Sequence, residues 1–146
     1  MNNVVKFSNG ELAWEARDYA QHQDDTGALG VVEYGRDFDF EVKRAFFVDT
    51  VKAGSIRGKH SHQELKQLVL CLKGSFLLEL DTGSEKCFFA LSSDRATCVY
   101  VDGRVWREMS DFSEDALMLV LCDREYKNDR VIRDYEQFLG NLNSCK

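Results

Sequence analysis

Proline is absent from this sequence of 146 residues, so other residues must set its turns. We expect glycine, aspartate and asparagine to do so, because they tolerate or stabilise turn conformations. Long apolar runs are also missing. No stretch approaches the ~20 residues that a membrane-spanning helix needs, and the first residues lack the apolar core of a signal peptide. These absences predict a cytoplasmic protein with no membrane partner.

Basic clusters and paired cysteines are scarce as well. The 25 acidic residues outnumber the 19 basic ones, and no block of lysine and arginine could follow a phosphate backbone. We therefore expect no nucleic-acid partner. The five cysteines are an odd number without a Cys-x-x-Cys pair, which indicates reduced core thiols and not a zinc or redox site.

Short runs rich in Val, Leu, Ile and Phe, separated by turn residues, fill the middle of the sequence. This pattern is typical of an antiparallel sandwich or barrel, because the runs are too close together for helical crossovers. Apolar residues at helical intervals within 128–140 predict one C-terminal amphipathic helix. The predicted strands are Ala28–Tyr34, Arg44–Thr50, Leu65–Leu72, Ser75–Asp81, Lys86–Leu91, Ala96–Val101 and Ala116–Cys122.

The length suits a single domain with one hydrophobic core. We divide the chain into an N-terminal arm, residues 1–26, and a globular domain, residues 27–146. The arm is polar and irregular, and we assign it no regular structure. His22, alone in this arm, is expected to be exposed and to have no role.

Two histidines stand two residues apart in Arg57-Gly-Lys-His60-Ser-His62. Residues with this spacing in a strand project from the same face, so both imidazoles should point into one cavity. Such a pair can hold a metal. Without a metal, one imidazole can accept a proton while the other returns it, because histidine titrates close to neutral pH.

The residues around this pair resemble the first cupin motif, which reads Gly, five residues, His-x-His, three or four residues, Glu, six residues, Gly. Gln67 stands in the glutamate position. A second segment, 100–109, resembles the other cupin motif, with Arg107 in place of a third histidine. A neutral amide is a poor ligand and a guanidinium cannot coordinate, so two of the four ligands are missing. We predict no metal and no cofactor.

Four further segments, 40–47, 68–75, 105–113 and 132–139, extend the resemblance. Together with the histidine motif they resemble the sugar-nucleotide 3,4-ketoisomerases, a WxcM-like cupin family. The resemblance implies an all-β fold: a cupin, or jelly-roll antiparallel β-sandwich, with one C-terminal helix. It also implies a homodimer, for which the segment before Tyr34 is a candidate for strand exchange.

The implied reaction converts dTDP-4-keto-6-deoxyglucose into a dTDP-3-keto-6-deoxyhexose for 3-amino sugar biosynthesis. By the resemblance, His60 and His62 transfer protons through an enediolate, with no metal. The predicted substrate-binding residues are Arg57, Arg44, Gln67, Trp106 and Arg107. Four of them have a plain structural alternative: Arg57 and Arg44 as solvated surface arginines, ordinary polar packing for Gln67, and a core position for Trp106.

Two departures from the family pattern leave other functions open. Phe46 and Phe47 stand where the family commonly has tyrosines, and Arg107 stands where it commonly has histidine. Losing these groups could change the reaction or abolish it. The alternatives are a sugar-nucleotide 3,5-epimerase, which also begins by removing the C3 proton, and a dTDP-sugar-binding cupin without catalytic activity.

Overall fold

A computed structural model describes residues 3–144, which form thirteen strands, a 3-10 helix and one α-helix. The elements follow one another as β1 Val4–Lys6, β2 Leu12–Asp18, β3 Ala20–Asp24, β4 Gly27–Val31, β5 Arg44–Val48, β6 Arg57–His62, β7 Lys66–Lys73, β8 Ser75–Asp81, β9 Lys86–Ser92, β10 Thr97–Asp102, β11 Trp106–Ser110, β12 Leu117–Cys122, η1 Tyr126–Asn128, β13 Val131–Ile132 and α1 Tyr135–Ser144. None of the helices described is long and apolar enough to cross a membrane.

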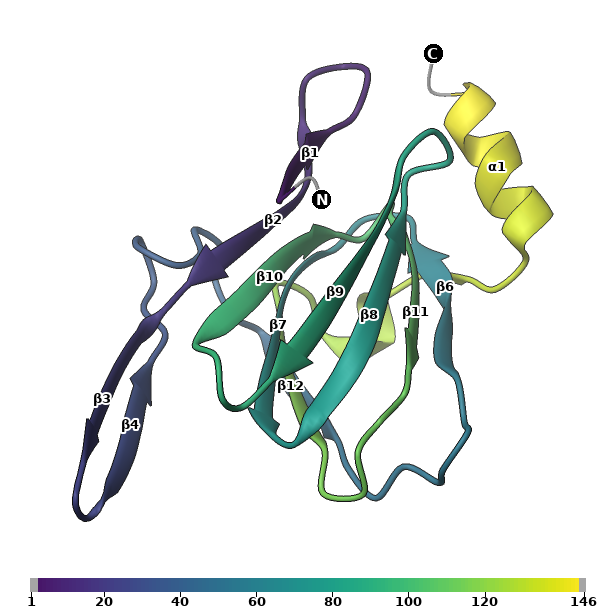
Figure 1. Cartoon of the computed structure of the whole chain (residues 1–146). Helices are drawn as coiled ribbons and strands as arrows, with labels where there is room; N and C mark the ends of the chain where they lie inside the picture. Colours follow the sequence, from purple (N-terminus) through teal and green to yellow (C-terminus); the bar gives the residue numbers. More distant parts are fainter. Residues whose placement is uncertain (1–2, 145–146) are drawn as a thin grey trace.

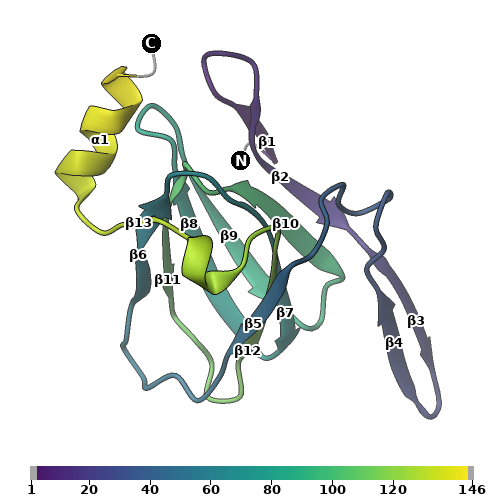
Figure 2. The ribbon, with the colours of Figure 1, turned by 180° about the vertical axis from the view of Figure 1, so that it is seen from behind.

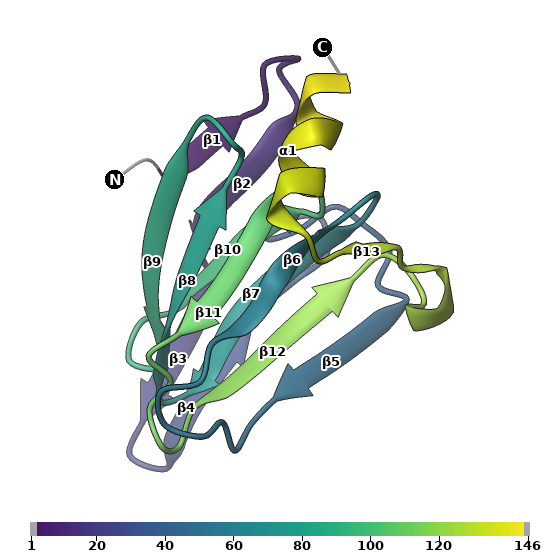
Figure 3. The ribbon, with the colours of Figure 1, turned by 90° about the vertical axis from the view of Figure 1, so that its right-hand side faces the viewer.

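Two antiparallel sheets form the body of the molecule (Figures 1 and 3). The larger has the order β1-β2-β10-β7-β12-β5, and the smaller has the order β13-β6-β11-β8-β9. Strands that are distant in sequence lie side by side in both, as expected for a jelly roll. The predicted fold class, an all-β antiparallel sandwich with one C-terminal helix, is confirmed.

The main core lies between the sheets and follows the two-residue period of the strands. On β8, for example, Phe76, Leu78 and Leu80 are buried, while Leu77 and Glu79 between them are partly exposed. Four of the five cysteines also belong to buried strand positions and are free thiols, as predicted: Cys71, Cys87, Cys98 and Cys122. Cys145 lies outside the described residues.

The N-terminal arm is more regular than we expected. Residues 3–26 contain β1, β2 and β3, and β2 pairs with β10 in the larger sheet, so the expectation of no regular structure is wrong. β3 and β4 form a separate hairpin that extends away from the two sheets (Figure 2). The proposed boundary between residues 26 and 27 falls in the turn of this hairpin. His22 is exposed on β3.

The C-terminal helix begins later than predicted, at Tyr135 instead of near Asn128. The residues before it do not continue a helix, because Val131 and Ile132 pair with His62 and Ser61 of β6 to form β13. Asp134 caps α1 by accepting a hydrogen bond from the backbone N–H of Glu136 at 2.8 Å. The pairing of β13 with β6 holds the end of the loop that follows β12 against the strand that carries the histidines.

Candidate active site

A cavity of about 310 Å³ opens between the two sheets. Its walls are mostly apolar side chains with a few charged and polar groups among them, which is the usual make-up of a ligand pocket. Six of the seven predicted site residues line it: His60, His62, Arg44, Arg57, Gln67 and Arg107.

β6 directs both histidines into this cavity, as the two-residue spacing predicted. The centroids of the His60 and His62 rings are 4.8 Å apart, and the rings are nearly perpendicular. The strand is irregular just before them, because Gly58 and Lys59 have φ values of 84° and 54° and the pairing with β11 shifts register. A Cβ on Gly58 would lie 3.0 Å from the carbonyl oxygen of Arg107. Glycine therefore allows β6 to approach β11 closely.

Both imidazoles are neutral at pH 7. Burial, followed by the positive charge of Arg107, lowers the pKa of His60 to about 4. The same two causes lower the pKa of His62 to about 3, although Asp129 acts in the opposite direction. His60 Nδ1 and His62 Nε2 are buried, and neither has a hydrogen-bond partner within residues 3–144. Each histidine thus has a ring nitrogen available to a ligand.

Arg107 places a buried cation beside the two histidines. Its side chain donates hydrogen bonds to Gln67 Oε1 and to the carbonyl oxygens of Asp102, Gly103 and Val105. Burial lowers the pKa of Arg107 to about 10, so the guanidinium stays charged at neutral pH. This charge can stabilise negative charge that develops on a ligand in the cavity.

The cavity residues do not fit a metal ion, although many cupins hold one. Arg107 and Gln67 occupy the positions of two expected ligands, and the guanidinium charge opposes a second cation nearby. Within the described part of the chain, no group of three or more His, Cys, Asp or Glu side chains is arranged to hold a metal.

Arg44 and Arg57 lie in different surroundings. Arg44, on β5, is partly buried and donates a hydrogen bond to Asp129 Oδ2 at 2.9 Å. Its guanidinium also lies 5.6 Å from the ring centroids of both Phe46 and Tyr126. Arg57 is exposed at the start of β6, on the rim of the cavity. Arg57 can therefore meet a ligand group that remains near solvent.

Asp129 is the main site residue that sequence reasoning missed. We placed it within the predicted helical segment 128–140. Instead, the carboxylate enters the cavity wall and lies 2.7 Å from His62 Nδ1. The pairing of β13 with β6 causes this placement, and a two-residue strand gives no usable sequence signal.

Trp106 does not line the cavity, so its predicted part in substrate binding is not supported. Because side chains alternate along β11, Arg107 and Met109 face the cavity while Trp106 faces away from it. Its ring packs against Tyr135 and Phe138 of α1, with centroids 5.2 Å and 5.5 Å away. The core alternative for this residue describes its position correctly.

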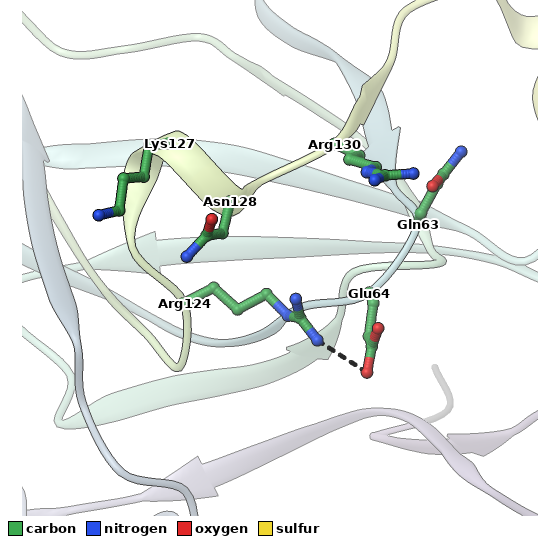
Figure 4. A pocket seen from close by; sticks show the side chains of 6 residues that line it. All are labelled: Gln63, Glu64, Arg124, Lys127, Asn128 and Arg130. Carbon is green, nitrogen blue, oxygen red and sulfur yellow. Dashed lines mark ion pairs between the residues drawn. The ribbon is translucent and has the colours of Figure 1, made fainter.

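A second depression, of about 350 Å³, lies on the surface near η1 (Figure 4). Its lining is polar and contains an ion pair of 2.8 Å between Arg124 and Glu64. η1 contributes to both hollows, with Tyr126 in the wall of the cavity and Lys127 in that of the depression. The depression contains no histidine, whereas His60 and His62 both line the cavity between the sheets.

Fold and site together define a cupin-type β-sandwich with two histidines and a buried arginine in the cavity between its sheets. The chain belongs to the family described as FdtA: WxcM-like, C-terminal, which matches residues 14–143. It is 36% identical over 115 residues to the TDP-4-oxo-6-deoxy-alpha-D-glucose-3,4-oxoisomerase of Aneurinibacillus thermoaerophilus, an alignment that spans 79% of this chain and 82% of that protein.

Solved structures of 3,4-ketoisomerases are similar over most of the chain. A mutant of QdtA from Thermoanaerobacterium thermosaccharolyticum, in complex with TDP-4-keto-6-deoxyglucose, superposes with a TM-score of 0.83 at 30% identity and covers 90% of this chain and 94% of that one. A 3,4-ketoisomerase from Helicobacter canadensis gives 0.82 at 30% identity, covering 89% and 97%. The 3'-monoepimerase ChmJ from Streptomyces bikiniensis, at 20% identity and a TM-score of 0.72 over 79% and 66%, shares the fold alone.

Proposed function

We propose that this chain is a metal-free 3,4-ketoisomerase that converts dTDP-4-keto-6-deoxyglucose into a dTDP-3-keto-6-deoxyhexose. One observation carries the proposal: two neutral histidines face one cavity beside a buried cation. The similarity to the Aneurinibacillus oxoisomerase and to ketoisomerase structures supports the choice of substrate.

In this reaction one histidine takes the proton from C3 of the sugar. The electron pair of the broken C–H bond forms an enediolate across C3 and C4, with negative charge on the oxygen at C4. The other histidine, after taking up a proton from solvent, gives it to C4, and the first histidine returns its proton to solvent. The proton of the C3 hydroxyl moves to the oxygen at C4, which leaves a ketone at C3 and a hydroxyl at C4. No electrons leave the sugar, so the step needs no redox partner, and His60 and His62 supply sufficient acid–base groups.

The surrounding polar groups can stabilise the enediolate and bind the rest of the substrate. Arg107 is a fixed cation within a mostly apolar cavity, where it stabilises the enediolate. Gln67 is held against it by a hydrogen bond. Arg57 lies at the rim, where its guanidinium can bind the pyrophosphate. Arg44 has a buried Nη1 without a hydrogen-bond partner within residues 3–144, which can donate to the substrate.

The direct test is to incubate the protein with dTDP-4-keto-6-deoxyglucose in deuterium oxide and follow the sugar by proton NMR. We expect a 3-keto product that carries deuterium at C4, and we expect His60→Asn to abolish its formation. Protium retained at C3 with no 3-keto product would contradict the proposal. The same spectra define the configuration at C4.

The experiment also separates the two alternatives. Deuterium at both C3 and C5 would indicate 3,5-epimerisation. Binding of dTDP in a calorimeter without any exchange would indicate a binding protein, an alternative motivated by Phe46, which lines the cavity where the family commonly has a tyrosine. Phe47 is 70% exposed and does not line the cavity, so the second replacement lies outside the site.

We further propose that the enzyme acts in the cytoplasm as a homodimer, and that a pyridoxal-phosphate aminotransferase consumes its 3-keto product. Such a sequence would supply 3-amino sugars to surface glycans such as a lipopolysaccharide O-antigen or an S-layer glycan. The hairpin of β3 and β4 supports the dimer, because it leaves the body of the molecule and exposes Leu29, which is 61% accessible.

A further inference from the structure

Asp129 joins two cavity residues that come from different sheets. Its Oδ1 lies 2.7 Å from His62 Nδ1, and its Oδ2 accepts a hydrogen bond of 2.9 Å from an Nη of Arg44. The three side chains are well shielded, with 6% of Asp129, 5% of His62 and 13% of Arg44 accessible. Both carboxylate oxygens are therefore held, one by β5 and the other by β6.

This geometry fixes where the proton of the His62 ring resides. Burial tends to raise the pKa of Asp129, but the hydrogen bond from Arg44 and the contact with His62 outweigh it and lower the pKa overall. Asp129 is thus a carboxylate, which can only accept hydrogen bonds. Since His62 is neutral, Nδ1 must carry the ring proton and Nε2 must carry a lone pair.

The lone pair at Nε2 is the part of His62 that no hydrogen-bond donor of residues 3–144 occupies. Nε2 is buried, and His62 lines the cavity. His60 differs, because no carboxylate within the described residues forms a hydrogen bond with its ring nitrogens. The two histidines are therefore not equivalent.

We propose that Asp129 is a positioning residue that holds His62 in the Nδ1–H form, so that every proton exchanged between His62 and the sugar passes through Nε2. Arg44 acts with it by fixing the second carboxylate oxygen. When Nε2 takes up a proton, the carboxylate faces the resulting imidazolium and stabilises it without itself being protonated. This inference rests on the proposed isomerase function and deepens it.

The first experiment needs no substrate. Nitrogen-15 NMR of the free protein distinguishes a ring nitrogen that carries a proton from one that carries a lone pair, and His62→Asn identifies the His62 signals. We expect a single Nδ1–H form at pH 7. A wild-type protein in which Nε2 carries the proton would overturn the inference, whether or not the protein isomerises any sugar.

Asp129→Asn supplies the second experiment, because an amide can either accept a hydrogen bond from Nδ1–H or donate one to a bare Nδ1. We expect a mixture of the two tautomers and a fall in kcat of roughly 10- to 100-fold, as for other residues that orient a reacting group, with little change in KM. Asp129→Glu keeps the charge and should restore the single tautomer and part of kcat.

Asp123→Asn is the matched control. This carboxylate accepts a hydrogen bond from the backbone N–H of Lys66 and lies outside the cavity lining, so its loss should leave both the tautomer and kcat unchanged. Unaltered kcat and tautomer in Asp129→Asn, with active wild type, would overturn the positioning role while leaving the isomerase proposal intact. A wild-type protein that shows the single Nδ1–H tautomer but no activity would contradict the isomerase proposal and leave the tautomer assignment intact.

Discussion

At the scale of single residues, the buried histidines make stability depend on pH. In the unfolded chain a histidine takes up a proton near pH 6.5, but folded His60 and His62 resist protonation down to about pH 4 and about pH 3. Between pH 6.5 and 4.5 the unfolded state therefore binds more protons, and stability falls as the pH falls. The lowered pKa of Asp129 acts in a separate window, below its ordinary value of 3.8.

We expect the free energy of unfolding to decrease across this window by at most about 1.4 kcal/mol per pH unit for each histidine. Urea denaturation at a series of pH values between 6.5 and 4.5 measures the slope. His60→Asn removes one of the two titrating groups and should reduce the slope by about half. An unchanged slope in this variant would show that other groups cause the dependence.

Single residues also show which parts of the site a sequence can reveal. The His60 and His62 pair was predictable, because two-residue spacing in a strand fixes a common face. Trp106 and Arg107 are neighbours on β11, so the same alternation turns them to opposite faces, and of the two only Arg107 meets the cavity. Asp129 was not predictable, because its contact with His62 depends on the pairing of β13 with β6.

At the scale of elements, β6 must bend to bring both histidines into the cavity. Gly58 permits the bend in two ways: its φ is 84°, and a side chain there would meet the Arg107 carbonyl and Met109. Gly35 has a similar φ of 90° but nothing within 4 Å of a Cβ. Alanine substitutions at these two glycines therefore separate the cost of backbone strain from the cost of a steric clash.

We expect Gly58→Ala to destabilise the protein more than Gly35→Ala does. Both variants place alanine at positive φ, which costs roughly 1 to 2 kcal/mol, and only the first adds a clash. Urea denaturation of both variants measures the difference, and isomerase assays should show loss of activity only in Gly58→Ala. Equal destabilisation by Gly58→Ala and Gly35→Ala would mean that β11 shifts to relieve the clash without a loss of stability.

The strands were predicted better than the segments that flank them. β8, for instance, was predicted with the observed bounds, because alternation of apolar residues is strong in a sheet that is buried on one face. β1 and β2 were missed although they carry the buried residues Val5, Ala13 and Trp14, because their apolar residues are adjacent and do not alternate. Pairing with distant segments, as of β2 with β10, makes them strands. The start of α1 was misplaced for the same reason.

At the scale of the whole molecule, the hairpin of β3 and β4 has few contacts within the chain to stabilise it. Its strands pair only with each other among the described residues, and most of their side chains are exposed. An isolated two-stranded hairpin is at best marginally stable in water, and its free edges can accept another strand. A second copy of the chain would provide both strand pairing and cover for Leu29.

We therefore expect sedimentation velocity to show a dimer, and we expect Leu29→Asp to weaken it by about tenfold or more in Kd, which corresponds to about 1.4 kcal/mol. Phe88→Asp is the control, because Phe88 is a 44% exposed apolar residue on β9, at the far edge of the smaller sheet. The charge should disrupt association only if it enters the interface, since an unpaired buried carboxylate is costly. A wild-type monomer, or a dimer that only Phe88→Asp dissociates, would show that the hairpin is not the contact between two copies.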